Sequence, residues 1–161
     1  MLLISSGVLM GHRMAQRLWD RADALRELSA AAELLRGELA ARRSLQSVCT
    51  RYGGSLPGMS GAFFRLLGAG LDRPDGRTLE EIWCMSVSDA FGQMLSPREI
   101  KPFCRLWAAL HTGAGMEDSL CRCIDQLERM ARQAEDTARQ DGRLWTGLGL
   151  ALGAALAIVL A

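Results

Sequence analysis

Along the second half of the chain, apolar residues recur every three or four positions, which is the spacing of one face of an α-helix. This apolar stripe consists of Leu120, Ile124, Leu127, Ala131, Ala134 and Ala138. Elsewhere on the same stretch, acidic residues precede basic residues by four positions, the order that stabilises a helix, in the pairs Asp118/Arg122, Asp125/Arg129, Glu128/Arg132 and Glu135/Arg139. The pattern predicts one long amphipathic helix that begins at Met116 and continues past Gly142.

The end of this predicted helix is uniformly apolar. Residues 144–161 contain no ionisable side chain, and as a helix they would extend about 27 Å, close to the thickness of a bilayer's hydrocarbon core. We therefore expect an all-α fold, a six-helix bundle whose last helix continues into a transmembrane segment over 143–161. Gly149, Gly153 and Ala157 would give that segment a face of small residues, against which another transmembrane helix could pack closely.

The start of the chain is also apolar, but residues 1–12 are too few to cross a bilayer as a helix. They fit the remainder of a longer anchor, an interfacial helix or a packed first turn. Residues 13–142 then form the predicted helical domain. Arginines cluster at both ends of this domain, next to the apolar segments, so the positive-inside rule places the domain in the cytoplasm of a single- or two-pass membrane protein.

Between the two ends, apolar spacing and glycine-rich breaks predict further helices. A long amphipathic helix should end near Arg42, and Ser44 is a candidate cap for a short helix to Arg51. Two loops are predicted, over 52–58 and over 70–76, with a buried helix between them. The apolar positions of the first of these helices are Leu25, Leu28, Ala32, Leu35 and Leu39.

Two helix starts carry a capping box, in which a hydroxyl and a glutamate three positions later bond each other's backbone amides. These boxes run from Thr78 to Glu81 and from Ser96 to Glu99. Pro102 lacks the N–H that a helix interior requires, so we expect either a kink there or a helix start delayed to Lys101.

Composition does not point to a nucleic-acid partner or to a metal site built on cysteines. A net charge of +1, with arginines interleaved among acids, gives no argument for a nucleic-acid partner. The five cysteines are odd in number, and Cys121 and Cys123 would point about 200° apart on a helix, so they cannot share a metal ion. We expect reduced thiols packed in or near a core, which indicates a reducing compartment.

No group of residues has the spacing of a catalytic, cofactor or metal site, and we expect none. Glu80 and Glu81 are explained by helix capping, while His12 and His111 are isolated. The glycines from Gly147 onward lie inside the apolar segment, without the strand and lysine of a phosphate-binding loop. An enzyme would need distant polar residues to converge, for example Asp89, His111 and Glu117.

The order and spacing of these features resemble the stage III sporulation protein AB family of endospore-forming bacteria. At the N-terminal end the resemblance is carried by Leu25-Arg-Glu-Leu28, Ala32-Glu-Leu-Leu35 and Glu38-Leu39. At the C-terminal end it is carried by Leu110, Gly113, Asp118, Leu127-Glu128 and Arg143-Leu-Trp-Thr-Gly-Leu-Gly149. Trp83 and Phe63-Phe64 stand where the family tends to have a Trp and a Phe. The family usually has a full N-terminal transmembrane helix, whereas the apolar stretch here is shorter.

The resemblance implies a platform component of the channel that links mother cell and forespore, required for sporulation. The family's domain, on the mother-cell cytoplasmic side, is similar to the helical domain of the type II secretion inner-membrane platform protein, the F component. The partners it implies are the stage III sporulation AA-type ATPase, other membrane proteins of the channel and the lipid bilayer. It leaves a homo-oligomer open. The residues themselves also fit an alternative, a tail-anchored helical adaptor or scaffold of an unrelated membrane complex.

Overall fold

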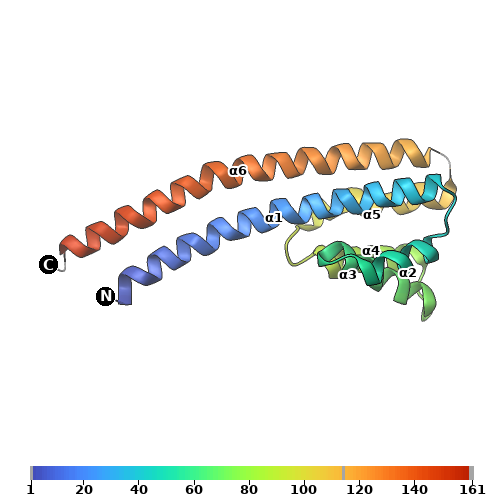
Figure 1. Ribbon diagram of the computed structural model, residues 1–161, viewed down its shortest axis with the longest axis horizontal. Helices are drawn as coiled ribbons and strands as arrows, with labels where there is room; N and C mark the ends of the chain where they lie inside the picture. Colours follow the sequence, from blue (N-terminus) through green and yellow to red (C-terminus); the bar gives the residue numbers. More distant parts are fainter. Residues whose placement is uncertain (1, 114, 160–161) are drawn as a thin grey trace. The chain divides into compact units, whose positions relative to one another are not determined.

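The computed structural model describes the backbone of residues 2–113 and 115–159, and the side chains of residues 13, 15–113 and 115–141. Within these residues the chain is all-α, as predicted, with six helices and no strand (Figure 1). The helices are α1 (Leu2–Ala40), α2 (Leu45–Ser55), α3 (Gly58–Asp72), α4 (Leu79–Phe91), α5 (Pro97–Thr112) and α6 (Met116–Val159). The first and last helices are long, and the four between them are short.

The chain divides into two compact units. The first combines Met1–Asp23 with Ala131–Ala161, and the second comprises Ala24–Met130. In the first unit, segments of α1 and α6 run in opposite directions (Figure 1). The side chains described there as buried are all alanines, which permit two helix backbones to approach closely, namely Ala22, Ala131, Ala134 and Ala138.

The apolar stripe predicted for the last helix is confirmed, because all six of its residues, from Leu120 to Ala138, are buried. Of the ion pairs predicted beside it, Glu135 and Arg139 lie 3.9 Å apart. Among the described residues, no helix is long and apolar enough to cross a membrane. The transmembrane segment predicted over 143–161 lies outside the residues whose side chains are described.

The second unit is built on an aromatic core contributed by α3, α4 and α5. The rings of Trp83 and Phe103 stack with centroids 5.3 Å apart, and Phe63 meets both edge-on at 5.4 and 5.3 Å. The indole N–H of Trp83 donates a 3.0 Å hydrogen bond to the carbonyl of Phe103. All three side chains are fully buried, so this cluster combines apolar burial with favourable ring geometry and a satisfied polar group.

Local capping fixes where the short helices begin. The Ser44 hydroxyl caps α2 by accepting from the amide of Ser47 at 3.3 Å, and both predicted capping boxes are present at α4 and α5. α5 begins at Pro97 and runs through Pro102, so the delayed start at Lys101 was wrong. Its well-capped first turn and its buried residues hold the helix despite the one backbone bond that Pro102 cannot donate.

The two predicted loops are shorter than expected because glycines at their edges are helical. α2 continues to Ser55, and Gly53 packs against the backbone of Arg65, whose guanidinium donates to the Gly53 carbonyl at 3.2 Å. α3 continues to Asp72, with Gly70 packed against Ile82. At both positions a missing side chain allows close helix packing, which offsets the low helix propensity of glycine.

Candidate functional site: a basic groove between α5 and α6

A groove of about 360 Å³ lies between α5 and the first part of α6, entirely within the second unit. Four cationic side chains line it: Arg98, Lys101 and Arg105 from α5, and Arg122 from α6. No acidic side chain is among the residues that line it. Its floor is apolar or weakly polar, and includes Pro102, Leu106, Ala109 and Cys123.

Helix periodicity explains how these side chains come together. Arg98, Lys101 and Arg105 stand at positions i, i+3 and i+7, which lie along one face of a helix. Arg122 projects from a corresponding face of α6, where it donates a 3.2 Å hydrogen bond to the hydroxyl of Ser119. Each wall of the groove is therefore a single helix face.

The cations on the α5 wall are not neutralised. The side chains of Arg98, Lys101 and Arg105 form no hydrogen bond or ion pair within the described part of the chain. Some arginines elsewhere in the described residues are paired, for example Arg43 with Glu38 at 2.8 Å. The full chain has a net charge of only +1, so four cations around one groove concentrate positive charge locally.

A second pocket, of about 270 Å³, lies between α3 and α4 and has a different character. Its rim includes the exposed apolar side chains of Leu66 and Met85, which are 39% and 44% exposed. Its charged residues are of both signs, since Arg73 and Arg77 stand with Asp75 and Asp89, and Arg77 pairs with Asp75 at 3.4 Å. Of these two pockets, the α5–α6 groove is the one whose charged lining residues all have the same sign.

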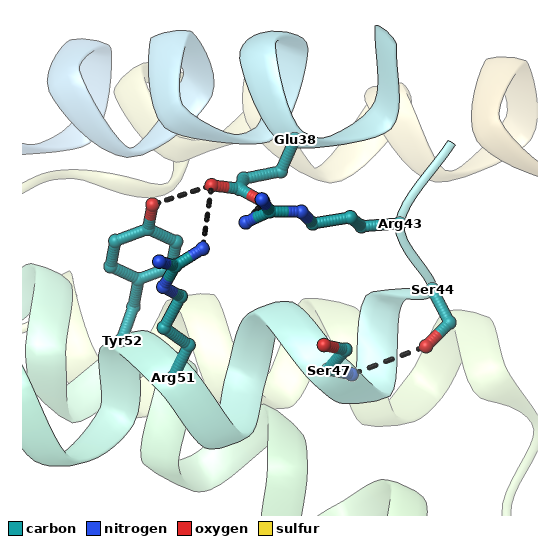
Figure 2. A network of polar contacts seen from close by, with 6 residues as sticks. All are labelled: Glu38, Arg43, Ser44, Ser47, Arg51 and Tyr52. Carbon is teal, nitrogen blue, oxygen red and sulfur yellow. Dashed lines mark hydrogen bonds and ion pairs between the residues drawn. The ribbon is translucent and has the colours of Figure 1, made fainter. Parts of the chain in front are cut away.

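A polar network joins the end of α1 to α2 (Figure 2). The Tyr52 hydroxyl donates a 2.6 Å hydrogen bond to Glu38, whose other carboxylate oxygen lies 2.8 Å from Arg43, while Arg51 is 3.8 Å away. The bond from Tyr52, with the charge of Arg43, holds the pKa of Glu38 below its ordinary value. The same bond raises the pKa of Tyr52. These contacts link α2 to the end of α1.

Asp89, His111 and Glu117, the example of polar residues that could converge in an enzyme, stand on three different helices, α4, α5 and α6. Asp89 lines the α3–α4 pocket, His111 stacks on Trp107 with centroids 6.0 Å apart, and Glu117 is exposed in the first turn of α6. Glu81 bonds the backbone of Thr78 at 2.8 Å, as its capping role predicts. Over the described residues, no set of three or more His, Cys, Asp and Glu is placed to hold a metal ion. Gly149, Gly153 and Ala157 lie outside the described side chains.

The five cysteines are free thiols, as expected. Cys49 and Cys123 are buried, and burial raises the pKa of the Cys49, Cys104 and Cys123 thiols to about 12. These three thiols therefore stay protonated and unreactive near neutral pH. Cys121 instead accepts a 3.5 Å hydrogen bond from Arg36 on α1, so it and Cys123 face different surroundings.

The groove was not identified from the sequence, although a signal was present. From Ile100 to Met116 the chain contains no acidic residue, whereas acids and bases alternate along the helix that follows. A helix face with cations at i, i+3 and i+7 and no carboxylate to pair with them indicates a positively charged surface. The contribution of Arg122 depends on the packing of α6 beside α5, which spacing alone does not give.

Comparison with known protein families gives a match to the full chain. The family model for stage III sporulation protein AB matches residues 1–161, the whole chain. The searches of curated proteins and of solved structures found no match to this chain.

Proposed function

The chain belongs to the stage III sporulation protein AB family, and on that premise we propose that it is a membrane-anchored platform of the mother cell–forespore channel. A role in sporulation follows from the family itself. The proposal adds that the helical domain stands in the mother-cell cytoplasm, that residues 143–161 anchor it in the bilayer, and that the domain docks an AA-type ATPase.

One observation carries the proposal. α6 runs as a single helix from Met116 to Val159, so the element that packs in the second unit also contains most of the segment with the composition of a membrane span. A helix transmits displacement and rotation better than a flexible linker of the same length. The proposed mechanism is therefore mechanical: the docked ATPase moves the domain, and α6 passes that movement to the membrane assembly.

The proposal also extends to contacts with the other membrane proteins of the channel. The channel's other membrane proteins would contact the anchor, where Gly149, Gly153 and Ala157 offer small side chains at helical spacing. A homo-oligomer would place several such anchors around one channel. The proposed role requires no catalytic residue in this chain, since the ATPase supplies the energy.

The first test is genetic. Deleting the gene in the native host should abolish heat-resistant spores after starvation, and a plasmid copy should restore them. Cells of the deletion strain should arrest after engulfment of the forespore. Normal spore counts in the deletion strain would contradict a role in the channel.

The second test addresses rigid coupling. Inserting a flexible Gly/Ser segment at Gly142 should abolish spore formation, whereas inserting an equally long alanine-rich helical segment should retain part of it. Circular dichroism and membrane fractionation of both variants would check that folding and anchoring are intact. Full sporulation with the flexible insertion would show that rigid transmission is not required.

A further inference from the structure

We propose that the groove between α5 and α6 is the docking site for an acidic helical segment of a protein partner. The inference rests on the proposed function only for the identity of that partner, the AA-type ATPase.

The charged side chains that line the groove are all positive. Single cations scattered over a surface have little meaning, but the groove is lined by four cations and by no acid. Three of them, Arg98, Lys101 and Arg105, are not paired within the described part of the chain, so a ligand need not displace an existing partner to reach them. Opposite charge on the ligand would be attracted at a distance and held at contact.

The cations of α5 are spaced along the helix axis. A helix rises about 1.5 Å per residue, so the Cα atoms of Arg98 and Arg105 lie about 10 Å apart along α5, with Lys101 between them. One phosphate or carboxylate group is far too small to reach all three. Carboxylates placed one turn apart on a partner helix recur about every 5.4 Å, which matches this ladder of cations.

The floor of the groove is largely apolar. Pro102, Leu106 and Ala109 provide an apolar strip between the cationic walls. An amphipathic acidic helix would place apolar side chains on this strip and carboxylates at the rim, in the way that helices dock into grooves generally. A duplex nucleic acid offers no such apolar face, and its affinity depends on many more phosphate contacts than four cations can make.

The experiment measures binding to the full chain in a neutral detergent. The groove variant is Lys101→Glu/Arg105→Glu, and the matched control is Arg42→Glu/Arg129→Glu, which reverses two exposed cations outside both pockets. The probes are the purified AA-type ATPase and a labelled synthetic helix with glutamates one turn apart and leucines between them. Circular dichroism verifies that both variants remain helical.

The wild type should bind both probes. The groove variant should bind each at least about tenfold more weakly, since two rim ion pairs are lost and replaced by like-charge repulsion. The control should bind within about twofold of the wild type. A synthetic helix with lysines in place of its glutamates should prefer the groove variant, which is a gain that misfolding cannot produce.

The outcomes separate this inference from the proposed function. Equal binding of the ATPase to the wild type and the groove variant would show that the groove is not the docking site. The proposal that the domain docks the ATPase would still stand. In another outcome, the ATPase fails to bind the wild type while the synthetic acidic helix binds the wild type and not the groove variant. That result would support the groove as a docking site for an acidic helix and would rule out the ATPase as its partner. Binding only to vesicles containing phosphatidylglycerol, with no binding of either protein probe, would overturn the inference in favour of a lipid surface.

Discussion

The carboxylate of Glu27 on α1 accepts a 3.0 Å hydrogen bond from the backbone amide of Ser60 in the first turn of α3. The residue before that helix is Pro57, which offers no side-chain cap. In return, the Ser60 hydroxyl donates a 2.9 Å hydrogen bond to the Glu27 carbonyl. A residue 33 positions away thus satisfies an amide that the local sequence leaves without a cap.

Replacing Glu27 with alanine should therefore destabilise the protein by about 1 kcal/mol, the usual cost of losing a helix cap. Glu33→Ala on the same helix is the matched control, because Glu33 is exposed, and it should change stability by less than about 0.5 kcal/mol. Urea unfolding followed by circular dichroism would measure both. Equal losses from the two substitutions would show that the contact with Ser60 does not stabilise α3.

Three glycines near the same junction should respond very differently to alanine. A Cβ at Gly61 would collide with the Leu56 carbonyl, and Gly58 has a φ of +74° with the Glu27 carboxylate 2.8 Å from the position of a Cβ. Gly61→Ala should cost about 3 kcal/mol or more and Gly58→Ala about 1–2 kcal/mol. Gly54 lies in a helix with open space around it, so Gly54→Ala should be neutral or stabilising by up to about 1 kcal/mol. Denaturant midpoints would rank the three, and a large loss at Gly54 would contradict the assignment of α2 through Ser55.

These contacts show which parts of the fold a sequence reveals. The two capping boxes were predicted to the residue because each is a bond between positions three apart. The buried stripe of α6 was predicted because apolar residues recur every three or four positions along one face of the helix. The helical end of α2 was not predicted, since it depends on the packing of Gly53 against Arg65 from α3. No local signal marks that contact.

The same division holds for the candidate site. The ladder of Arg98, Lys101 and Arg105 is present in the spacing of one helix, and the lack of acids from Ile100 to Met116 could have identified it. The groove exists only because α6 packs beside α5 and adds Arg122 and the floor residue Cys123. Long-range packing therefore decides whether a cationic helix face becomes a wall of a groove or an ordinary solvated surface.

The bond between the Trp83 indole and the Phe103 carbonyl predicts a cost for an otherwise mild substitution. Trp83→Phe keeps an aromatic ring but removes the donor and leaves a small cavity, so it should destabilise the protein by about 2–3 kcal/mol. Trp19→Phe is the control, because that side chain is 38% exposed, and its effect should stay below about 0.5 kcal/mol. Thermal unfolding would compare them. A Trp83→Phe variant as stable as Trp19→Phe would show that α4 and α5 do not depend on this contact.

The link between Glu38 and Tyr52 should make the stability of the protein depend on pH at both ends of the scale (Figure 2). The folded pKa of Glu38 is lowered, so its contribution is complete above the ordinary pKa of about 4.3 and is lost as the pH falls through the lower folded value. The folded pKa of Tyr52 is raised, so its contribution is complete below the ordinary pKa of about 10 and is lost as the pH rises through the higher folded value.

The variant Tyr52→Phe isolates this contribution, since it removes the hydroxyl and keeps the ring that lies 5.8 Å from Phe64. The difference in unfolding free energy between wild type and variant should be constant between about pH 5 and pH 9 and should shrink beyond either limit. In the variant, NMR titration should find the pKa of Glu38 closer to its ordinary value, although Arg43 still lowers it. A difference that stays the same from pH 3 to pH 11 would mean that Tyr52 stabilises α2 by packing alone.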